Sequence, residues 1–231
     1  MTRALRFAAA LAFCLASVGA CSSGPPPDLS FRYTVFGEPY NIDQTVMITN
    51  PRTDEAAIPT LEFEPQDAHQ VAIPGLTVES LFGSTKGRLL VPPGSAFDIL
   101  RFTGDRAADV RTVSVKTVSV RWAPFHHPET VVPTLEFVDA SGAAMTKFDD
   151  FAAIDVPNPN DFEIKVGVLY IVWTDPGLPP PQQAAQTAMF DSPITVAPHK
   201  TSRVQLNEAV KAAMAARGEN AAVSVKVFLV P

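Results

Sequence analysis

The chain has 231 residues and carries 18 lysines and arginines against 24 aspartates and glutamates, a net charge of −6 at pH 7. This acidic balance argues against binding to nucleic acid and against electrostatic attraction to anionic lipid surfaces. Its 22 prolines are about twice the average proportion and lie scattered between valine-rich runs. Such a composition favours many short strands joined by turns over helices.

The first 21 residues have the organisation of a secretory signal. Arg3 and Arg6 precede an uncharged apolar run over 7–16, which is too short to cross a bilayer. The segment Val18–Cys21 (Val-Gly-Ala-Cys) then resembles the lipobox of bacterial lipoproteins. The resemblance implies cleavage after residue 20 and attachment of lipid to the sulfur of Cys21. An ordinary secretory signal with a chance cysteine is the alternative.

A lipid on Cys21 determines where the protein resides. Two acyl chains suffice for stable membrane attachment. Residues 21–28 then form a tether, and its seven residues after the cysteine span at most ~25 Å. The residue after the lipidated cysteine is Ser22 and not aspartate. In Gram-negative lipoproteins this resembles the signal for sorting to the outer membrane. We therefore expect a lipid-anchored protein of the cell envelope, which in a Gram-negative cell lies on the outer membrane facing the periplasm.

The rest of the chain is predicted to be all-β, an antiparallel β-sandwich of jelly-roll type with one short C-terminal helix. The only cysteines are Cys14 and Cys21, so the hydrophobic core alone must hold this body together. We divide it into an N-terminal β region, 29–109, and a C-terminal β-sandwich, 110–231, which together can also form one continuous domain. Strands are expected over 31–36, 44–49, 60–64, 96–102, 110–122, 131–138, 162–174, 193–197 and 222–230.

Two of these segments allow more specific predictions. In 110–122 the apolar positions change from odd to even numbers between Val115 and Val118, which a strand with one inward face cannot do without an extra residue. We therefore place a β-bulge or a change of sheet near Lys116-Thr117. In 162–174 both faces become apolar from residue 166 onward, which is typical of a central strand covered on both sides.

A short internal echo links the two regions. Ile58–Phe63 (IPTLEF) is repeated in altered form as Val132–Phe137 (VPTLEF). Duplication of an ancestral half and chance similarity between the starts of two strands both explain it.

One segment near the C-terminus has helical spacing. Apolar residues recur at i, i+4, i+7 and i+8 from Leu206 to Met214. Asn207 is the expected N-cap, and Gly218 the expected glycine that follows the helix. We expect the apolar stripe of this helix to pack on the sandwich.

Chemically reactive side chains are few. The neighbouring His126 and His127 diverge on extended backbone, so with Glu129 they form at most a weak metal site, and a solvated turn is the alternative. The sequence carries none of the signatures of serine hydrolases, P-loop NTPases, dinucleotide-binding proteins or zinc peptidases. We therefore predict a protein without catalytic residues or cofactor. A deep pocket gathering His126 or His199 with two carboxylates would favour an enzyme instead.

Four segments in the C-terminal region form a recognisable series: 118–124 (VSVRWAP), 145–151 (MTKFDDF), 196–210 (VAPHKTSRVQLNEAV) and 223–231 (VSVKVFLVP). In their order and spacing they resemble the C-terminal β-sandwich domain of plant-type polyphenol oxidases and tyrosinases. Lys147-Phe148-Asp149 matches the start of the Lys-Phe-Asp-Val signature of that family, while Asp150 stands in place of valine. The copper-binding helical domain of the family has no counterpart in this sequence.

The resemblance implies a module without chemistry of its own, because in that family this domain covers the copper site. We therefore expect a lipid-anchored, noncatalytic protein-binding module, whose partner by analogy is a tyrosinase-like type-3 copper oxidase that it caps or assists. The alternative is a carbohydrate-binding or structural envelope lipoprotein. In that case Trp122, Tyr170 and Trp173 would be exposed for stacking on sugars.

Overall fold

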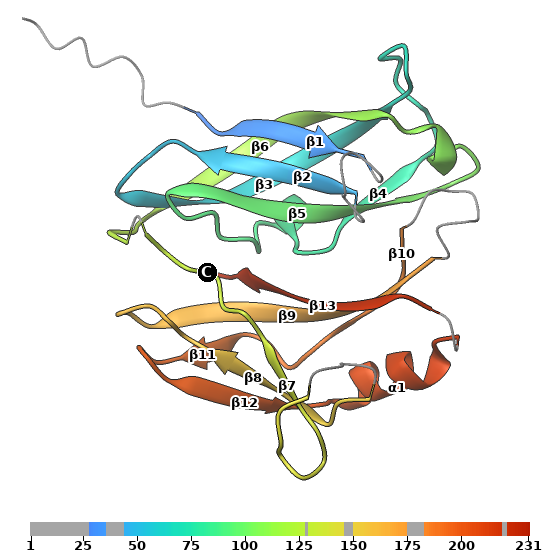
Figure 1. Cartoon of the computed structure of the whole chain (residues 1–231). Coiled ribbons are helices and arrows are strands. Elements are labelled where there is room, and N and C mark those ends of the chain that lie inside the picture. The colour runs from blue at the N-terminus through green and yellow to red at the C-terminus, as the bar shows by residue number, and fades with distance from the viewer. Residues whose placement is uncertain (1–27, 36–43, 128, 146–149, 175–182, 219–220) are drawn as a thin grey trace, which may run out of the picture.

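The computed structural model describes residues 28–35, 44–127, 129–145, 150–174, 183–218 and 221–231. The signal segment 1–20, Cys21 and the tether up to residue 27 lie outside these residues, as does the signature Lys147-Phe148-Asp149. Within the described residues the chain forms antiparallel strands in two halves, one above the other in Figure 1.

The first half consists of six strands and two short 3-10 helices. These are β1 (Ser30–Thr34), β2 (Thr45–Asn50), β3 (Glu55–Gln66), β4 (Thr77–Ser80), η1 (Ser84–Lys86), β5 (Gly94–Thr103), η2 (Ala107–Asp109) and β6 (Thr112–Pro124). The second half consists of seven strands and one α-helix. These are β7 (Glu136–Val138), β8 (Ala153–Pro157), β9 (Ile164–Trp173), β10 (Ala184–Met189), β11 (Ile194–Val196), β12 (Thr201–Gln205), α1 (Glu208–Ala216) and β13 (Val223–Leu229).

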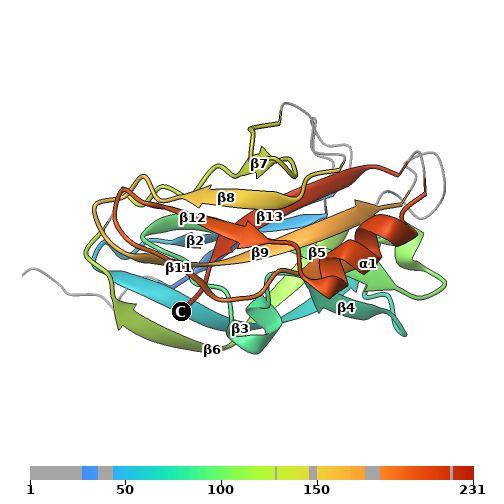
Figure 2. The same ribbon diagram turned by 90° about the horizontal axis from the view of Figure 1, so that it is seen from below.

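Each half is built from facing sheets. In the first half, a sheet in the order β1-β2-β5-β4 faces the two-stranded β3–β6 sheet. In the second half, β9 pairs with β10 and β11 on one side and with β13 on the other, and this sheet faces the β12-β8-β7 sheet. Seen from below in Figure 2, β12, β8 and α1 lie over β9. The prediction of an antiparallel β-sandwich with one short helix near the C-terminus is confirmed.

The two halves share a hydrophobic core. Leu169, Ile171 and Trp173 of β9 pack into one cluster with residues of the first half such as Ile48 and Leu61. Joint burial of this kind favours one continuous domain over two separate ones.

Strand β6 belongs to the first half by its pairing, although we assigned it from sequence to the C-terminal region 110–231. It pairs with β3 along its whole length, from Glu55 opposite Pro124 to Gln66 opposite Thr112. The first half of the structure therefore extends to Pro124, and VSVRWAP, the first segment of the family resemblance, lies in it.

The predicted bulge in β6 is confirmed. Thr60 of β3 lies opposite Ser119, but Leu61 lies opposite Thr117, so that Val118 is the extra residue. Val118 is 51% exposed. The bulge turns this side chain outward and lets Val115 and Val120 both contact the core despite their opposite parity.

The prediction for β9 is also confirmed, because it is buried on both faces from Val166 to Trp173. Its even-numbered residues pack into the core of the second half. Its odd-numbered residues from Leu169 onward pack into the cluster shared with the first half. The strand therefore occupies the middle of the molecule (Figure 1).

Some local predictions were wrong. The strand expected over 131–138 is limited to β7, at 136–138. The two copies of the internal echo therefore differ in structure, since 58–63 lies within β3 whereas 132–135 precedes β7. Strands β4, β8, β10 and β12 were not predicted, because they are short and several of their side chains are polar or alanine.

Helix α1 begins as predicted but ends differently. Asn207 is the N-cap, and its side chain accepts a hydrogen bond from the backbone N–H of Val210 at 3.0 Å. Val210 and Ala213 are buried against the sandwich, as expected. The helix ends because Arg217 is extended, with φ −66° and ψ 143°, and Gly218 does not supply a left-handed turn. Within the described ranges no helix is long and apolar enough to span a membrane.

Candidate functional site

The structure brings three of the four histidines together. His126 and His127, which follow β6, and His199, in the turn before β12, line one open cleft of about 480 Å³ with Glu129 and Asp161. His199 lies 72 residues after His127 in the chain, so only the fold places these imidazoles in one cleft.

Two buried asparagines hold the walls of this histidine cleft. Asn160 receives a hydrogen bond from the backbone N–H of Val131 at 2.8 Å and donates one to the carbonyl of the same residue at 2.9 Å. Asn158 donates to the carbonyls of Phe162 at 2.7 Å and Val196 at 3.0 Å. The two side-chain amides therefore connect three separate segments of the chain. These contacts were not predicted from the sequence, although Asn-Pro-Asn at 158–160 is typical of a turn.

The histidine cleft does not have the geometry of a metal centre. His127 stacks on Phe162, with the ring centroids 3.6 Å apart, while His126, His199 and Glu129 are exposed. No three His, Cys, Asp or Glu side chains of the described residues are close enough to hold a metal ion. Within the described residues, the ionisable side chains of the cleft form no hydrogen bonds with one another.

A second hollow, which we call the junction groove, lies where the two halves meet. It has a volume of about 430 Å³ and is lined from the first half by the segment around η1 and from the second half by β9, β10 and β13. Phe82 and Phe228 line it and stack with their centroids 4.4 Å apart and their planes 8° apart. Met189, 37% exposed, lies on the β10 side.

The wall of the junction groove around η1 is fixed by Asp98 of β5. This fully buried carboxyl accepts backbone N–H groups from Phe82 at 2.8 Å, Ser84 at 3.0 Å and Ile99 at 2.7 Å. Burial raises the pKa of Asp98, and the three N–H donors partly oppose that effect. Gly83 has φ 83°, a left-handed conformation that glycine adopts without strain. These hydrogen bonds hold the loop around η1 in one backbone conformation.

Two cations lie at the rim of the junction groove, together with Glu79, which is paired with Arg101. Lys86 and Arg88 are exposed and line it, and within the described ranges neither forms an ion pair with a carboxylate. Sequence reasoning missed this site, because its residues come from segments about one hundred positions apart. The only local signal is a loop bounded by two glycines, Gly83 and Gly87.

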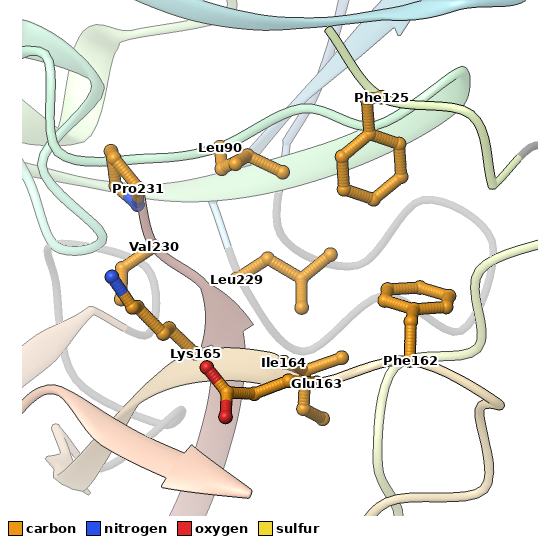
Figure 3. Close-up of a pocket in the computed structure, with 9 residues that line it drawn as sticks. All are labelled: Leu90, Phe125, Phe162, Glu163, Ile164, Lys165, Leu229, Val230 and Pro231. Carbon is orange, nitrogen blue, oxygen red and sulfur yellow. The ribbon is translucent and has the colours of Figure 1, made fainter. Parts of the chain in front are cut away.

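A smaller apolar crevice of about 180 Å³ opens beside the C-terminus. Figure 3 shows Leu90 and Phe125 on one side of it and Leu229 and Phe162 on the other. The rings of Phe125 and Phe162 meet edge to face at 5.8 Å. The two halves touch along this crevice, and part of the apolar surface there stays exposed to solvent.

The aromatic residues proposed for sugar stacking are not arranged for it. Tyr170 is fully buried and Trp173 is 3% exposed, with its indole N–H donating to Ser224 at 2.9 Å. The third, Trp122, is half-buried, and the guanidinium of Arg52 covers its ring at 3.5 Å. A carbohydrate-binding role therefore loses the stacking surface on which it depended.

Comparison with known proteins gives little further guidance. The chain matches no protein-family model and no curated protein. Among solved structures it is similar to the E. coli chaperone DraB, with 12% sequence identity over 83% of this chain and 89% of that chain. The TM-score of 0.20 is too low for this likeness to say anything about fold or function.

Proposed function

We propose that this protein is a noncatalytic binding module of the cell envelope, anchored by lipid on Cys21, and that the junction groove receives another protein. The observation that carries the proposal is a preorganised groove that combines an apolar floor with a cationic rim. Met189 supplies exposed apolar surface beside the largely buried rings of Phe82 and Phe228, while Lys86 and Arg88 supply the charge.

The chemistry of the junction groove indicates what it binds. Its exposed methionine is adaptable, as on many protein-binding surfaces. Glu79, the acidic side chain of the lining, is paired with Arg101, so the two cations Lys86 and Arg88 favour carboxylates on the partner. The described lining residues include no histidine or cysteine, so the groove offers a surface for recognition rather than a nucleophile with its base. We therefore infer an acidic segment with apolar side chains as the ligand.

The identity of the partner rests on the family resemblance alone. In polyphenol oxidases the similar domain covers a copper site, so a separately encoded type-3 copper oxidase is the specific partner that we propose. The alternative is a carbohydrate-binding or structural envelope lipoprotein. The burial of Tyr170 and Trp173 disfavours the carbohydrate-binding role.

The test is recovery of the partner from detergent-solubilised membranes with the tagged, full-length protein. We expect one protein to co-purify, and its recovery to fall about tenfold or more in the double variant Lys86→Glu/Arg88→Glu. Arg121→Glu/Lys200→Glu is the matched control, because both residues are exposed cations outside the junction groove that form no ion pair within the described ranges. Equal recovery with the double variant would refute the groove as the binding site. Recovery of a partner without copper would refute the oxidase assignment only.

A further inference from the structure

We propose that one end of the molecule rests on the bilayer in which Cys21 is anchored, through the side chains of Val131 and Val132. We call it the Ser30 end, because β1 begins there. The inference rests on the proposed lipid anchor and adds to it an orientation and a contact surface.

The point at which the chain enters the fold places the Ser30 end near the membrane. Ser30 lies opposite Thr49 on β2, and Thr49 lies opposite Ser95 on β5. The seven residues between Cys21 and Leu29 reach at most ~25 Å when fully extended. The Ser30 end is therefore held within that distance of the lipid headgroups.

The same end carries exposed apolar side chains. Val131 is 54% and Val132 is 44% exposed. Val132 borders a small apolar pocket together with Ser95, which lies two strand spacings, or ~10 Å, from Ser30. The apolar crevice of Figure 3 is lined by Phe125, which directly follows the end of β6.

The backbone beneath these valines is fixed rather than loose. Asn160 bonds both the N–H and the carbonyl of Val131. Pro133, which follows Val132, is buried. The two side chains are therefore presented outward by a segment that cannot turn them into the core. An apolar pair held in this way is suited to insertion between lipid headgroups.

The opposite end of the molecule is out of reach of such a contact when the Ser30 end faces the bilayer. β3 runs over 12 residues from Glu55, near the Ser30 end, to Gln66. Its length is ~40 Å at the usual rise of a strand. Val71, 58% exposed, lies in the turn just beyond Gln66. It is a matched control, the same residue type at similar exposure but far from the tether.

The contact is apolar at Val131 and Val132, and the exposed carboxylates of Glu129 and Asp161 lie beside Val131 in the histidine cleft. The chain is acidic, so its charge gives no attraction to anionic headgroups, and the lipid anchor supplies the affinity. Salt that screens charges should therefore not weaken the contact.

The test is hydrogen exchange on the mature chain, coupled through Cys21 to a maleimide phospholipid in phosphatidylethanolamine–phosphatidylglycerol vesicles. We expect exchange over 126–132 to be slowed several-fold relative to the uncoupled chain, and exchange over 67–72 to be unchanged. The double variant Val131→Glu/Val132→Glu should abolish the slowing, and Val71→Glu should leave it intact. The same pattern is expected at low and high salt.

Unchanged exchange over 126–132, or equal slowing over 67–72, would overturn the proposal, as would slowing that survives in the double variant. Because the coupling is chemical, these results do not depend on processing in the cell. The mass of the N-terminal peptide from native membranes tests the anchor separately. An unmodified Cys21 there would refute the proposed lipid anchoring, and the physiological orientation with it.

Discussion

Replacing Phe228 by alanine should show whether the two halves of this protein fold as one unit. Phe228 lies on β13, is 6% exposed, and stacks on Phe82 of the first half at 4.4 Å. It also fills the space over Gly167, its partner on β9, where a Cβ atom would lie 2.4 Å from the ring. The ring therefore connects three segments across the junction.

The expected cost follows from these contacts. Removing a buried phenylalanine side chain destabilises a core by about 3–5 kcal/mol, through lost transfer free energy and the cavity left behind. Phe82 is only 1% exposed, and Gly167 has no side chain, so neighbours can fill the cavity only partly. We therefore place the loss near the upper half of that range. Of this loss, about 0.5–1.5 kcal/mol belongs to the ring pair.

Urea unfolding followed by tryptophan fluorescence and by circular dichroism measures this loss. We expect one transition with both probes, shifted to lower urea by about 1–2 M in Phe228→Ala. A double-mutant cycle with Phe82→Ala should give a coupling energy of about 0.5–1.5 kcal/mol. A loss below about 3 kcal/mol, or two separate transitions in the parent protein, would refute the reasoning that the shared core makes the halves one cooperative unit.

Three further variants test other elements. Gly167→Ala forces the new methyl group against the ring of Phe228 and should cost about 1–3 kcal/mol in urea unfolding, while a smaller loss would mean that the ring can move. Asn207→Ala removes the cap of α1 together with the hydrogen bonds from the same amide to Met189 and Asp191, and should cost at least about 1 kcal/mol, of which Asn207→Ser should restore the part due to the cap. The hydrogen bonds from Arg203 lower the pKa of Asp155, so this pair stabilises the fold above the unfolded pKa and the contribution is lost as the pH falls through the folded pKa. Asp155→Asn should therefore be less stable than the parent at pH 7 in thermal unfolding, with a difference that begins to shrink below about pH 4 and is lost as the pH falls through the lower folded pKa; a constant difference would contradict the ion pair.

Features that depend on neighbouring residues were predictable from the sequence. The parity change in β6 placed the bulge within one residue of Val118, because side chains alternate strictly along a strand. The doubly apolar run of β9 identified the central strand, because only a strand covered on both sides loses its polar face. Asn207 was identified as the N-cap because capping is a contact over three residues.

Features that depend on distant residues were not predictable from the sequence. Nothing near Lys86 or Arg88 indicates that β10 and β13 complete a groove with them, since that contact joins segments about one hundred residues apart. Gly218 looked like the end of a helical motif, but the chain leaves α1 through an extended Arg217 toward β13 instead. Short strands such as β12 form because β8 offers a partner, not because their own residues demand it.

The sequence by itself therefore determined the all-β class, the bulge, the central strand and the start of the helix, because each follows from periodicity or from contacts within a few residues. Only the tertiary structure decided that β6 belongs with β3, that His199 joins His126 and His127, and that a cationic groove lies between the halves. These arrangements depend on which apolar faces cover one another, and that choice is made by the whole core at once.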